Sequence, residues 1–511
     1  MTPVMLGLLF AGAAHASNLD AIGVTALREL VPSLTGTGVL VAQPEAGSPA
    51  WEVNPATTGL PASLFTCLSS GGSASTFPNA LGQESGHADE VAGNFYGVTL
   101  GVAPGVAHVN SYEAGYLAGT LVPTLAAIPA AVVNQSFIMG GQVSATDLSY
   151  DRYVATFNTI FCSGSGNSGA PNSPSTAFNG LSVGSSSGGG TSVGPTSDGR
   201  CKPDISAPGD LTSFSTALVS GCATILMQAG ARGDGGAGTV SAATNVLTIK
   251  ALLLNGAAKP ASWTNTPTQP LDFLYGAGVV NALNSYRQLR GGAQIATVSN
   301  TMSVGGAHLP PSTANNVPAR RGWNLPSIST SIAPPRDAVH HYFFDLRNDS
   351  NRVFTLTATL VWNRQFGQTA INNLDLFLYD AGTSILLAAS QSAVDNVEHL
   401  YVTNLPPRRY DLQVLKRGGV SAVTQSETYA LAFDFGPPIA AQLANPSRVG
   451  NAFQVQVMGE PYTRYAVLGT DDFLTWTPVA TNTTPSAGFF TYTNAAAGSL
   501  GQQFYRTRWL P

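Results

Sequence analysis

The stretch LTSFSTALVSGCATILMQA, residues 211–229, decides the fold of this chain. Its apolar side chains recur at helical spacing on almost every side. A helix that is apolar all round is buried inside a large domain. Ser213 stands at its start, where free backbone N–H groups and the positive end of the helix dipole favour a developing anion. The sequence therefore predicts a buried helix over 213–229 with a candidate nucleophile in its first turn.

Short apolar runs, Gly/Ser loops and helical stretches alternate around this helix, from Ser17 to about Arg290. Such an alternation is typical of a parallel sheet with crossover helices, in which functional side chains gather at the carboxyl ends of the strands. We therefore expect an α/β domain with a parallel sheet over 17–290. The predicted strands are 39–43, 107–111, 131–134, 159–163 and 180–184, and the other predicted helices are 248–258 and 282–289.

Three further polar residues of this region lie at the ends of predicted elements. Glu45 ends the first strand, His87 lies between a polar loop and a helical segment, and Asn167 follows a strand in a Gly/Ser loop. An imidazole is the usual base for a serine hydroxyl, a carboxylate can orient that imidazole, and an amide N–H can donate to an oxyanion. Taken singly, a serine at a helix start is more often an N-cap, and an asparagine in such a loop is more often a turn residue.

Seven groups of residues, taken in chain order, resemble the subtilisin-like (subtilase) serine peptidases. They are TGVLVA at 37–42 before the acidic position, HADEVAG at 87–93 with GVAP at 101–104, VVNQS at 132–136, GN at 166–167, DGRCKPDISAPG at 198–209, TSFSTALVSG at 212–221 and YGAGVVNA at 275–282.

The resemblance covers roughly residues 21–290 and implies a subtilisin-like fold that hydrolyses peptide bonds through an acyl-enzyme. By this resemblance Ser213 is the nucleophile, His87 the general base and Asn167 the oxyanion donor. Ser136 ends a strand similar to the family's substrate-binding strand, although it fits an ordinary strand end equally well.

The chain departs from the family at the acid position, where Glu45 replaces Asp and is one methylene longer. Leu211 replaces the glycine before Thr-Ser, and Ala88 replaces the glycine after the histidine. None of these changes removes a triad functional group, and other triad hydrolases use Glu. Asp89 is the competing acid, but a neighbour two residues away rarely reaches the far imidazole nitrogen. The alternative to a peptidase is a subtilase-fold binding scaffold that has lost catalysis, supported by Glu45 and Leu211.

A second serine motif, GLSVG at 180–184, fits the nucleophile elbow of α/β-hydrolases. That elbow needs a helix after the serine, and SSSGGG at 185–190 is a poor helix former. We therefore expect a strand there.

The rest of the chain has β patterns and no helical stretch. Residues 336–437 alternate apolar and polar positions between turns, which predicts an antiparallel sandwich. Through NLDLFLY at 373–379, VDNVE at 394–398 and LPPRRYDLQV at 405–414, this part resembles jelly-roll modules that follow the catalytic domain in some bacterial subtilases. Residues 438–511 predict a smaller β domain, and 291–335, rich in Gly, Pro, Asn and Ser, predict a linker or domain seam.

Composition restricts partners and location. Of 511 residues, 10% are charged, and a net charge of −5 without a Lys/Arg run makes nucleic acid an improbable partner. The apolar stretch at 3–14 is too short to span a membrane, and Ala14-His15-Ala16 fits a signal-peptidase site, so residues 1–16 predict a signal peptide and a secreted, extracellular or periplasmic protein. We expect protein or peptide substrates and a monomer.

The sequence leaves open how the cysteines pair and whether carboxylates of the sandwich bind calcium. The four cysteines, Cys67, Cys162, Cys201 and Cys222, allow up to two disulfides in three connectivities. We expect no cofactor and no metal at the site, although calcium is an open alternative at acidic residues of the sandwich, where turn formers are the commoner case. Those acidic residues are Asp375, Asp380, Asp395 and Glu398.

Overall fold

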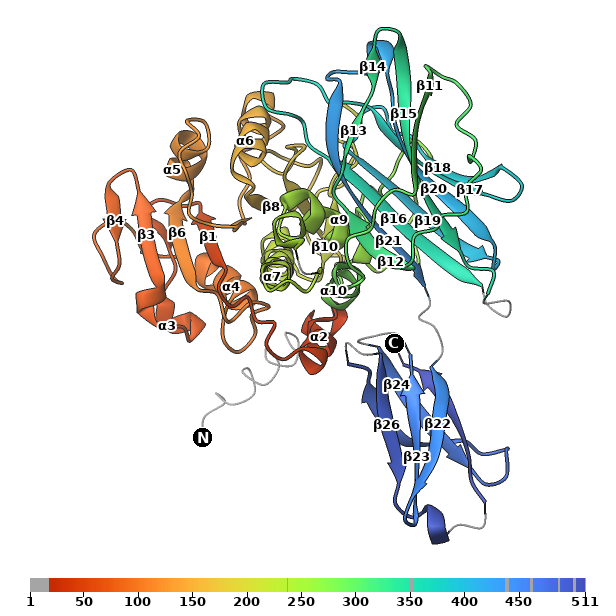
Figure 1. The fold of residues 1–511 in the computed structure, drawn as a ribbon. Helices are drawn as coiled ribbons and strands as arrows, with labels where there is room; N and C mark the ends of the chain where they lie inside the picture. Colours follow the sequence, from red (N-terminus) through yellow and green to blue (C-terminus); the bar gives the residue numbers. More distant parts are fainter. Residues whose placement is uncertain are drawn as a thin grey trace, which may run out of the picture. The chain divides into compact units, whose positions relative to one another are not determined.

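The computed structural model describes residues 18–236, 238–348, 353–436, 441–459, 463–485, 488–499 and 502–510 (Figure 1). The predicted signal peptide, residues 1–16, lies outside the described residues. The chain forms two compact units, Met1–Phe435 and Gly436–Pro511.

The first part of the larger unit is built on one eight-stranded sheet in the order β10-β9-β8-β7-β1-β6-β3-β4. All neighbouring strands are parallel except β3 and β4, which form a hairpin at one edge. The strands are β1 (Leu40–Glu45), β3 (Phe65–Ser69), β4 (Gly72–Ala74), β6 (His108–Glu113), β7 (Val132–Gln135), β8 (Ile160–Gly164), β9 (Leu181–Ser185) and β10 (Ile205–Ala207). This arrangement confirms the predicted α/β class.

The strand order reverses at β1. From β1 the chain first builds β3, β4 and β6 on one side and then β7 to β10 on the other, so β1 lies between β6 and β7. In parallel sheets the crevice at such a reversal, beyond the carboxyl ends of the strands, is where ligands bind. Glu45 is the last residue of β1 and therefore lies at this point.

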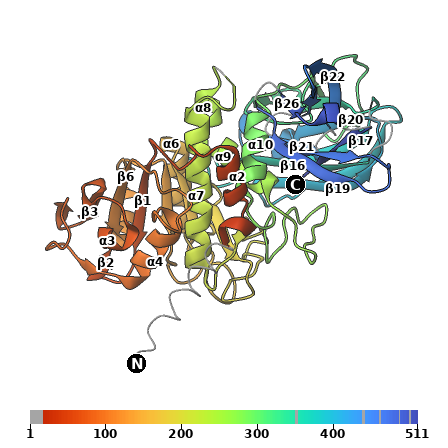
Figure 2. The ribbon, with the colours of Figure 1, turned by 90° about the horizontal axis from the view of Figure 1, so that it is seen from below.

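Helix α7 (Thr212–Ala231) confirms the predicted buried helix. It contacts β7, β8 and β9 and lies beside α4, α9 and α10 (Figures 1 and 2). It is long and apolar enough to cross a membrane, yet 83% of that apolar window is buried inside the protein. The other helices are α2 (Val24–Leu30), α3 (Pro55–Thr58), α4 (Gly86–Phe95), α5 (Ala114–Tyr116), α6 (Ser144–Phe157), α8 (Val240–Ala243), α9 (Val246–Gly256) and α10 (Ala282–Arg290).

A β-sandwich completes the larger unit, as the alternating patterns predict. One sheet has the order β11-β15-β20-β17-β18 with β14 beside β15, and the other has the order β12-β21-β16-β19 with β13 beside β21. Large apolar side chains such as Trp362 and Phe433 fill the space between the two sheets. The strands are β11 (Val298–Ser303), β12 (Arg321–Asn324), β13 (Ser327–Ser329), β14 (Ser331–Ile332), β15 (Pro335–Asp345), β16 (Phe354–Trp362), β17 (Leu374–Asp380), β18 (Ile385–Ser390), β19 (Val397–Leu405), β20 (Arg409–Lys416) and β21 (Ser426–Gly436).

The sandwich shares a core with the α/β part. Val361 on β16 and Ala432 on β21 belong to the same apolar cluster as the residues of α7, α9 and α10. Helix α9 packs against β16, and the Trp323 indole donates to the Leu289 carbonyl over 3.1 Å. Both ribbon views show α10 beside the sandwich (Figures 1 and 2).

The segment 291–335, predicted as a linker or domain seam, contains β11 to β14. β11 pairs with β15 and β12 pairs with β21, so this segment supplies strands to both sheets. These strands could not be predicted from the sequence, because VSNTMS (β11) and RGWN (β12) show little alternation of apolar and polar residues.

The smaller unit consists of two three-stranded sheets, β22-β23-β26 and β25-β24-β27. Its core is formed by Ala441, Val457, Tyr465, Val467 and Phe490. The strands are β22 (Gln442–Val449), β23 (Ala452–Met458), β24 (Arg464–Thr470), β25 (Thr477–Thr483), β26 (Phe489–Asn494) and β27 (Phe504–Trp509).

The four cysteines form no disulfide. Cys67, Cys162, Cys201 and Cys222 are all free and buried. Burial raises the pKa of the Cys67 and Cys162 thiols to about 12.

Candidate active site

The acid position lies deep at the reversal of the sheet. Glu45 is 3% exposed, and its Oε1 accepts from the backbone N–H of Ala46 over 3.1 Å. Its other oxygen, Oε2, lies 2.9 Å from Nδ1 of His87. A carboxylate oxygen can only accept, so Nδ1 carries the proton of this bond and Nε2 is left to act as a base.

His87 is held by the first turn of α4. Ser85 caps this helix by accepting from the N–H of Ala88 over 3.2 Å. Gln43 on β1 donates to the Ala88 carbonyl over 2.9 Å, which fixes the start of α4 against the strand that carries Glu45. The Tyr96 hydroxyl in turn donates to Gln43 over 2.7 Å. Apart from the presence of a glutamine within an apolar strand, no sequence pattern indicates this support.

The electrostatics of His87 are dominated by its carboxylate. The hydrogen bond to Glu45 raises the pKa of His87, and the opposing effect of burial is smaller. The His87 side chain is 37% exposed while that of Glu45 is 4% exposed. The imidazole therefore has one nitrogen fixed on a buried anion and the rest of the ring open to a substrate.

Asp89, the competing acid, points elsewhere. Its Oδ1 accepts from the backbone N–H of Asn54 over 2.7 Å. Burial, together with the nearby Glu84, raises its pKa to about 6.

Ser213 is the second residue of α7 and is 7% exposed. Among the described residues its Oγ bonds to the carbonyl of Ser136, over 3.4 Å, and not to His87. The ring of Phe214, the next residue, has its centroid 5.9 Å from that of His87. Helices α4 and α7 thus bring the two side chains to one place. A catalytic hydrogen bond is often long or absent before substrate binds, so its absence here does not exclude Ser213 as the nucleophile.

Asn167 is oriented by the start of α7. Its Oδ1 accepts from the backbone N–H of Thr212 over 3.0 Å and from the Thr212 hydroxyl over 2.9 Å. A backbone N–H can only donate, so the atom facing Thr212 must be the amide oxygen. The Nδ2 group is consequently left as a donor, and it has no hydrogen-bond partner within the part of the chain that the structure describes. Asn167 itself is exposed.

Ser136 directly follows β7 and joins it to α7. Its hydroxyl donates to the Ser213 carbonyl over 2.9 Å and accepts from the Asn134 amide over 2.9 Å. Ser136 is 7% exposed, and its hydroxyl is fully used within the protein by these two bonds.

The second serine motif lies on β9, as expected for a strand. Ser182 is fully buried, and no helix starts at 185–190 in the structure. It is not placed as a nucleophile would be.

The acidic residues considered for calcium have partners within the protein. Asp375 pairs with Arg417 and Asp380 with Arg408, while Glu398 accepts from the N–H of Ser392 over 2.6 Å. Asp395 accepts from the N–H of Cys201 over 2.8 Å. Across the described ranges, no group of three or more His, Cys, Asp or Glu side chains could hold a metal ion.

A parallel α/β sheet with a carboxylate, a histidine and a helix-start serine at its carboxyl ends, in that chain order, defines the subtilisin-like class of serine peptidases. Residues 70–278 match the model of the Subtilase family (Peptidase_S8). Residues 70–278, which lie in the α/β part of the chain, are therefore similar to the serine peptidases of the subtilase family. The matched range contains His87, Asn167 and Ser213 and begins after Glu45.

Three peptidases are among the solved structures that match this chain. A protease from Pseudoalteromonas arctica is 18% identical, with 51% of this chain and 92% of that chain covered and a TM-score of 0.36. Pseudomonas sedolisin, a serine-carboxyl proteinase, is 14% identical, with coverage of 50% and 93% and a TM-score of 0.34. Tripeptidyl peptidase 2 is 12% identical with a TM-score of 0.33, and the match spans 84% of this chain but about half, 52%, of that one. No curated protein matches the sequence.

Proposed function

We propose that this protein is a secreted serine endopeptidase whose triad is Ser213, His87 and Glu45. The observation that carries the proposal is the 2.9 Å contact between Nδ1 of His87 and the buried Oε2 of Glu45. The longer glutamate side chain supports the imidazole in the way that the family's aspartate does. Ala14-His15-Ala16 supports export.

The proposed reaction begins when Ser213 Oγ turns from the Ser136 carbonyl toward Nε2 of His87. The oxygen attacks the carbonyl carbon of the scissile peptide bond, and Nε2 takes the hydroxyl proton. Glu45 stabilises the imidazolium that results. The Nδ2 group of Asn167, together with N–H groups at the start of α7, donates to the oxygen that becomes negative.

The tetrahedral intermediate then collapses. The C–N bond breaks, His87 gives its proton to the leaving amine, and the acyl group remains on Ser213. A water molecule, deprotonated by His87, then attacks the acyl carbon. The bond between this carbon and Ser213 Oγ breaks, His87 returns its proton to Oγ, and the carboxylic acid product leaves. In this scheme the backbone that follows Ser136 pairs with the extended substrate.

A fluorophosphonate probe on the purified protein tests the proposal. The unmodified protein should be labelled at Ser213 and should cleave internal bonds of a denatured protein, whereas Ser213→Ala should do neither. The rival function, a binding scaffold without catalysis, is favoured by the bond of Ser213 Oγ to the Ser136 carbonyl instead of to His87. Absence of labelling and cleavage in the unmodified protein would establish the rival.

A further inference from the structure

The segment that follows Ser136 is paired along one edge only. The N–H of Met139 donates to the Ser173 carbonyl over 2.7 Å, and the N–H of Ser173 donates to the Gly141 carbonyl over 2.8 Å. Among the described residues, the backbone groups of Phe137, Ile138 and Gly140 have no such partner. They are the groups that an extended peptide could use in strand-like pairing. The position of this segment therefore depends on the loop that carries Ser173.

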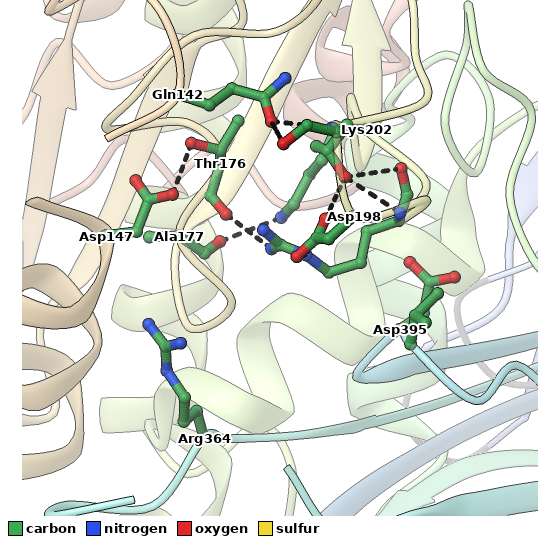
Figure 3. A network of polar contacts seen from close by, with 12 residues as sticks. Gln142, Asp147, Thr176, Ala177, Asp198, Lys202, Arg364 and Asp395 are labelled. Atoms are coloured by element: carbon green, nitrogen blue, oxygen red, sulfur yellow. Dashed lines mark hydrogen bonds and ion pairs between the residues drawn. The ribbon is translucent and has the colours of Figure 1, made fainter. Parts of the chain in front are cut away.

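That loop, residues 172–179, is fixed from inside the domain by Asp147. The Ser173 hydroxyl donates to one oxygen of this buried carboxylate over 2.8 Å, and the Thr176 hydroxyl donates to the other over 2.7 Å. Figure 3 shows Thr176 between Asp147 and the neighbouring polar network. The Thr176 carbonyl accepts from Arg200 over 2.6 Å, so both sides of the loop are held.

The far end of the same loop is held by the sandwich. The backbone N–H of Arg364, two residues after β16, donates to the Asn179 side chain over 2.7 Å. The Asn179 amide donates back to the Arg364 carbonyl over 2.9 Å. This reciprocal pair joins the sandwich directly to the loop.

The guanidinium of Arg364 strengthens this junction. It forms an ion pair with Asp151 of α6, and the side chains are 10% and 1% exposed. It also lies 4.7 Å from the centre of the Phe178 ring, to which Arg200 comes within 3.9 Å. Asp151 accepts from the N–H of Asn179 over 2.7 Å, so one buried carboxylate binds both the sandwich and the loop. Arg364 points from the sandwich toward the network in Figure 3.

We propose that Arg364 is a positioning residue for substrate binding: through Asn179 and Asp151 the sandwich sets the loop 172–179, and the loop sets the substrate-pairing segment 137–141. The proposal rests on the proposed peptidase function. It makes the sandwich part of the substrate-binding apparatus rather than a separate module. The reacting groups at Ser213, His87 and Glu45 are held by α7, α4 and β1 and do not depend on this path.

The test compares a long substrate with a short one in the full-length protein. The double variant Asp151→Asn/Arg364→Gln removes both buried charges and leaves neither unpaired. Rates on an eight-residue fluorogenic peptide and on p-nitrophenyl acetate are divided by the number of sites that a fluorophosphonate labels. We expect KM for the peptide to rise roughly tenfold or more with kcat little changed, and the ester rate per labelled site to stay the same.

Two further variants keep the test decisive. Arg364→Lys retains the charge but loses the planar fork that pairs with Asp151 and stacks on Phe178, and it should show the same split at smaller size even if the double variant does not fold. Arg347→Ala, which removes an exposed sandwich arginine paired with Asp345, should change neither rate.

An unchanged peptide KM, or an equal loss of peptide and ester rates per labelled site, would overturn the positioning role. If the unmodified protein is not labelled by the fluorophosphonate and does not hydrolyse the ester, the proposed peptidase function is wrong. If the unmodified protein is labelled but its variants bind the peptide normally, only the positioning role of Arg364 is wrong.

Discussion

The candidate site and the junction between the α/β domain and the sandwich use polar side chains in opposite ways. At the site, Nε2 of His87 and Nδ2 of Asn167 have no partner among the described residues, and Ser213 Oγ makes one long contact of 3.4 Å. At the junction, Asn179 and Asp151 are bonded to the backbone or side chain of residues on both sides. The polar groups of the site are therefore available to a substrate, whereas those of the junction bond to other residues and hold the two parts of the fold together.

This difference predicts that substitutions in the two regions have separable effects. A polar group without a hydrogen-bond partner in the protein can contribute to turnover, but it contributes little to the free energy of unfolding. A buried charge that is paired with an opposite charge contributes to stability, because removing one partner leaves the other unpaired in a poorly solvated place.

Ser213→Ala should give the largest effect and the clearest separation. We expect kcat to fall by about 10⁶-fold, because the nucleophile is lost. The free energy of unfolding should change by less than about 1 kcal/mol, since the hydroxyl makes one long hydrogen bond. Peptidase assays and denaturant titration measure the two quantities. A cleavage rate equal to that of the unmodified protein would assign the nucleophile elsewhere.

Glu45→Gln should lower turnover by roughly 10²–10⁴-fold, because the amide favours the wrong imidazole tautomer and cannot stabilise the imidazolium. The direction in which the pH profile of kcat/KM shifts provides an independent test of the role of Glu45. Glu45 raises the pKa of His87, and the neutral imidazole is the base, so removing the charge should move the acid limb of kcat/KM to lower pH. A limb that does not move would show that another group sets the titration of His87.

Glu45→Asp serves as the matched variant, because it keeps the charge and shortens the side chain by one methylene. Since Oε2 lies 2.9 Å from Nδ1 in this backbone, the shorter carboxylate should fall short of the ring and lose activity. Full activity would mean that the strand end adapts to either residue.

Asp151→Ala tests the other region. The Arg364 guanidinium would remain buried without its partner, so we expect the free energy of unfolding to fall by about 3–5 kcal/mol. Activity per labelled site on a small ester should persist. Denaturant titration beside Arg347→Ala, whose midpoint should not shift, provides the comparison. A loss no greater than that of the control would show that the buried pair does not stabilise the junction.

Asp89→Asn should have the smallest effect on activity, within twofold, because the Asp89 carboxylate bonds to Asn54 and not to His87. Its effect on stability should depend on pH. The pKa of Asp89 is raised to about 6 in the folded protein, so the native state binds more protons than the unfolded chain, and stability should fall as pH rises from about 4 to 6. The asparagine variant should lose that part of the slope. An activity loss as large as that of Glu45→Gln would make Asp89 the orienting acid instead.

The sequence was most informative where apolar periodicity is regular. The buried helix and the five predicted strands of the α/β domain lie within a few residues of their predicted positions, because their patterns follow from burial. The four strands at 298–332 were missed, since short edge segments such as VSNTMS are defined by the strands that they pair with.

At the site, the sequence placed polar residues at the correct strand and helix ends but not their contacts. The bond between Asn167 and Thr212 joins residues 45 positions apart, and that between Asn179 and Arg364 joins residues 185 positions apart. Such contacts depend on the packed fold and leave no local pattern. The rotamer of Ser213 likewise cannot be predicted from a sequence pattern. The roles of Glu45, His87, Ser213, Asn167 and Ser136 stay predictions until the variants are measured.

The four buried thiols can report local unfolding of the larger unit, because each becomes reactive only when the structure around it opens. Cys67 lies on β3, Cys162 on β8, Cys222 on α7 and Cys201 just before β10, so each samples a different part of the larger unit. Burial raises the pKa of all four, and a thiol that is both covered and protonated reacts slowly with an alkylating reagent. A timed pulse of iodoacetamide followed by mass spectrometry would therefore show in which order the hairpin of β3 and β4, the strand β8, the segment before β10 and the helix α7 become accessible.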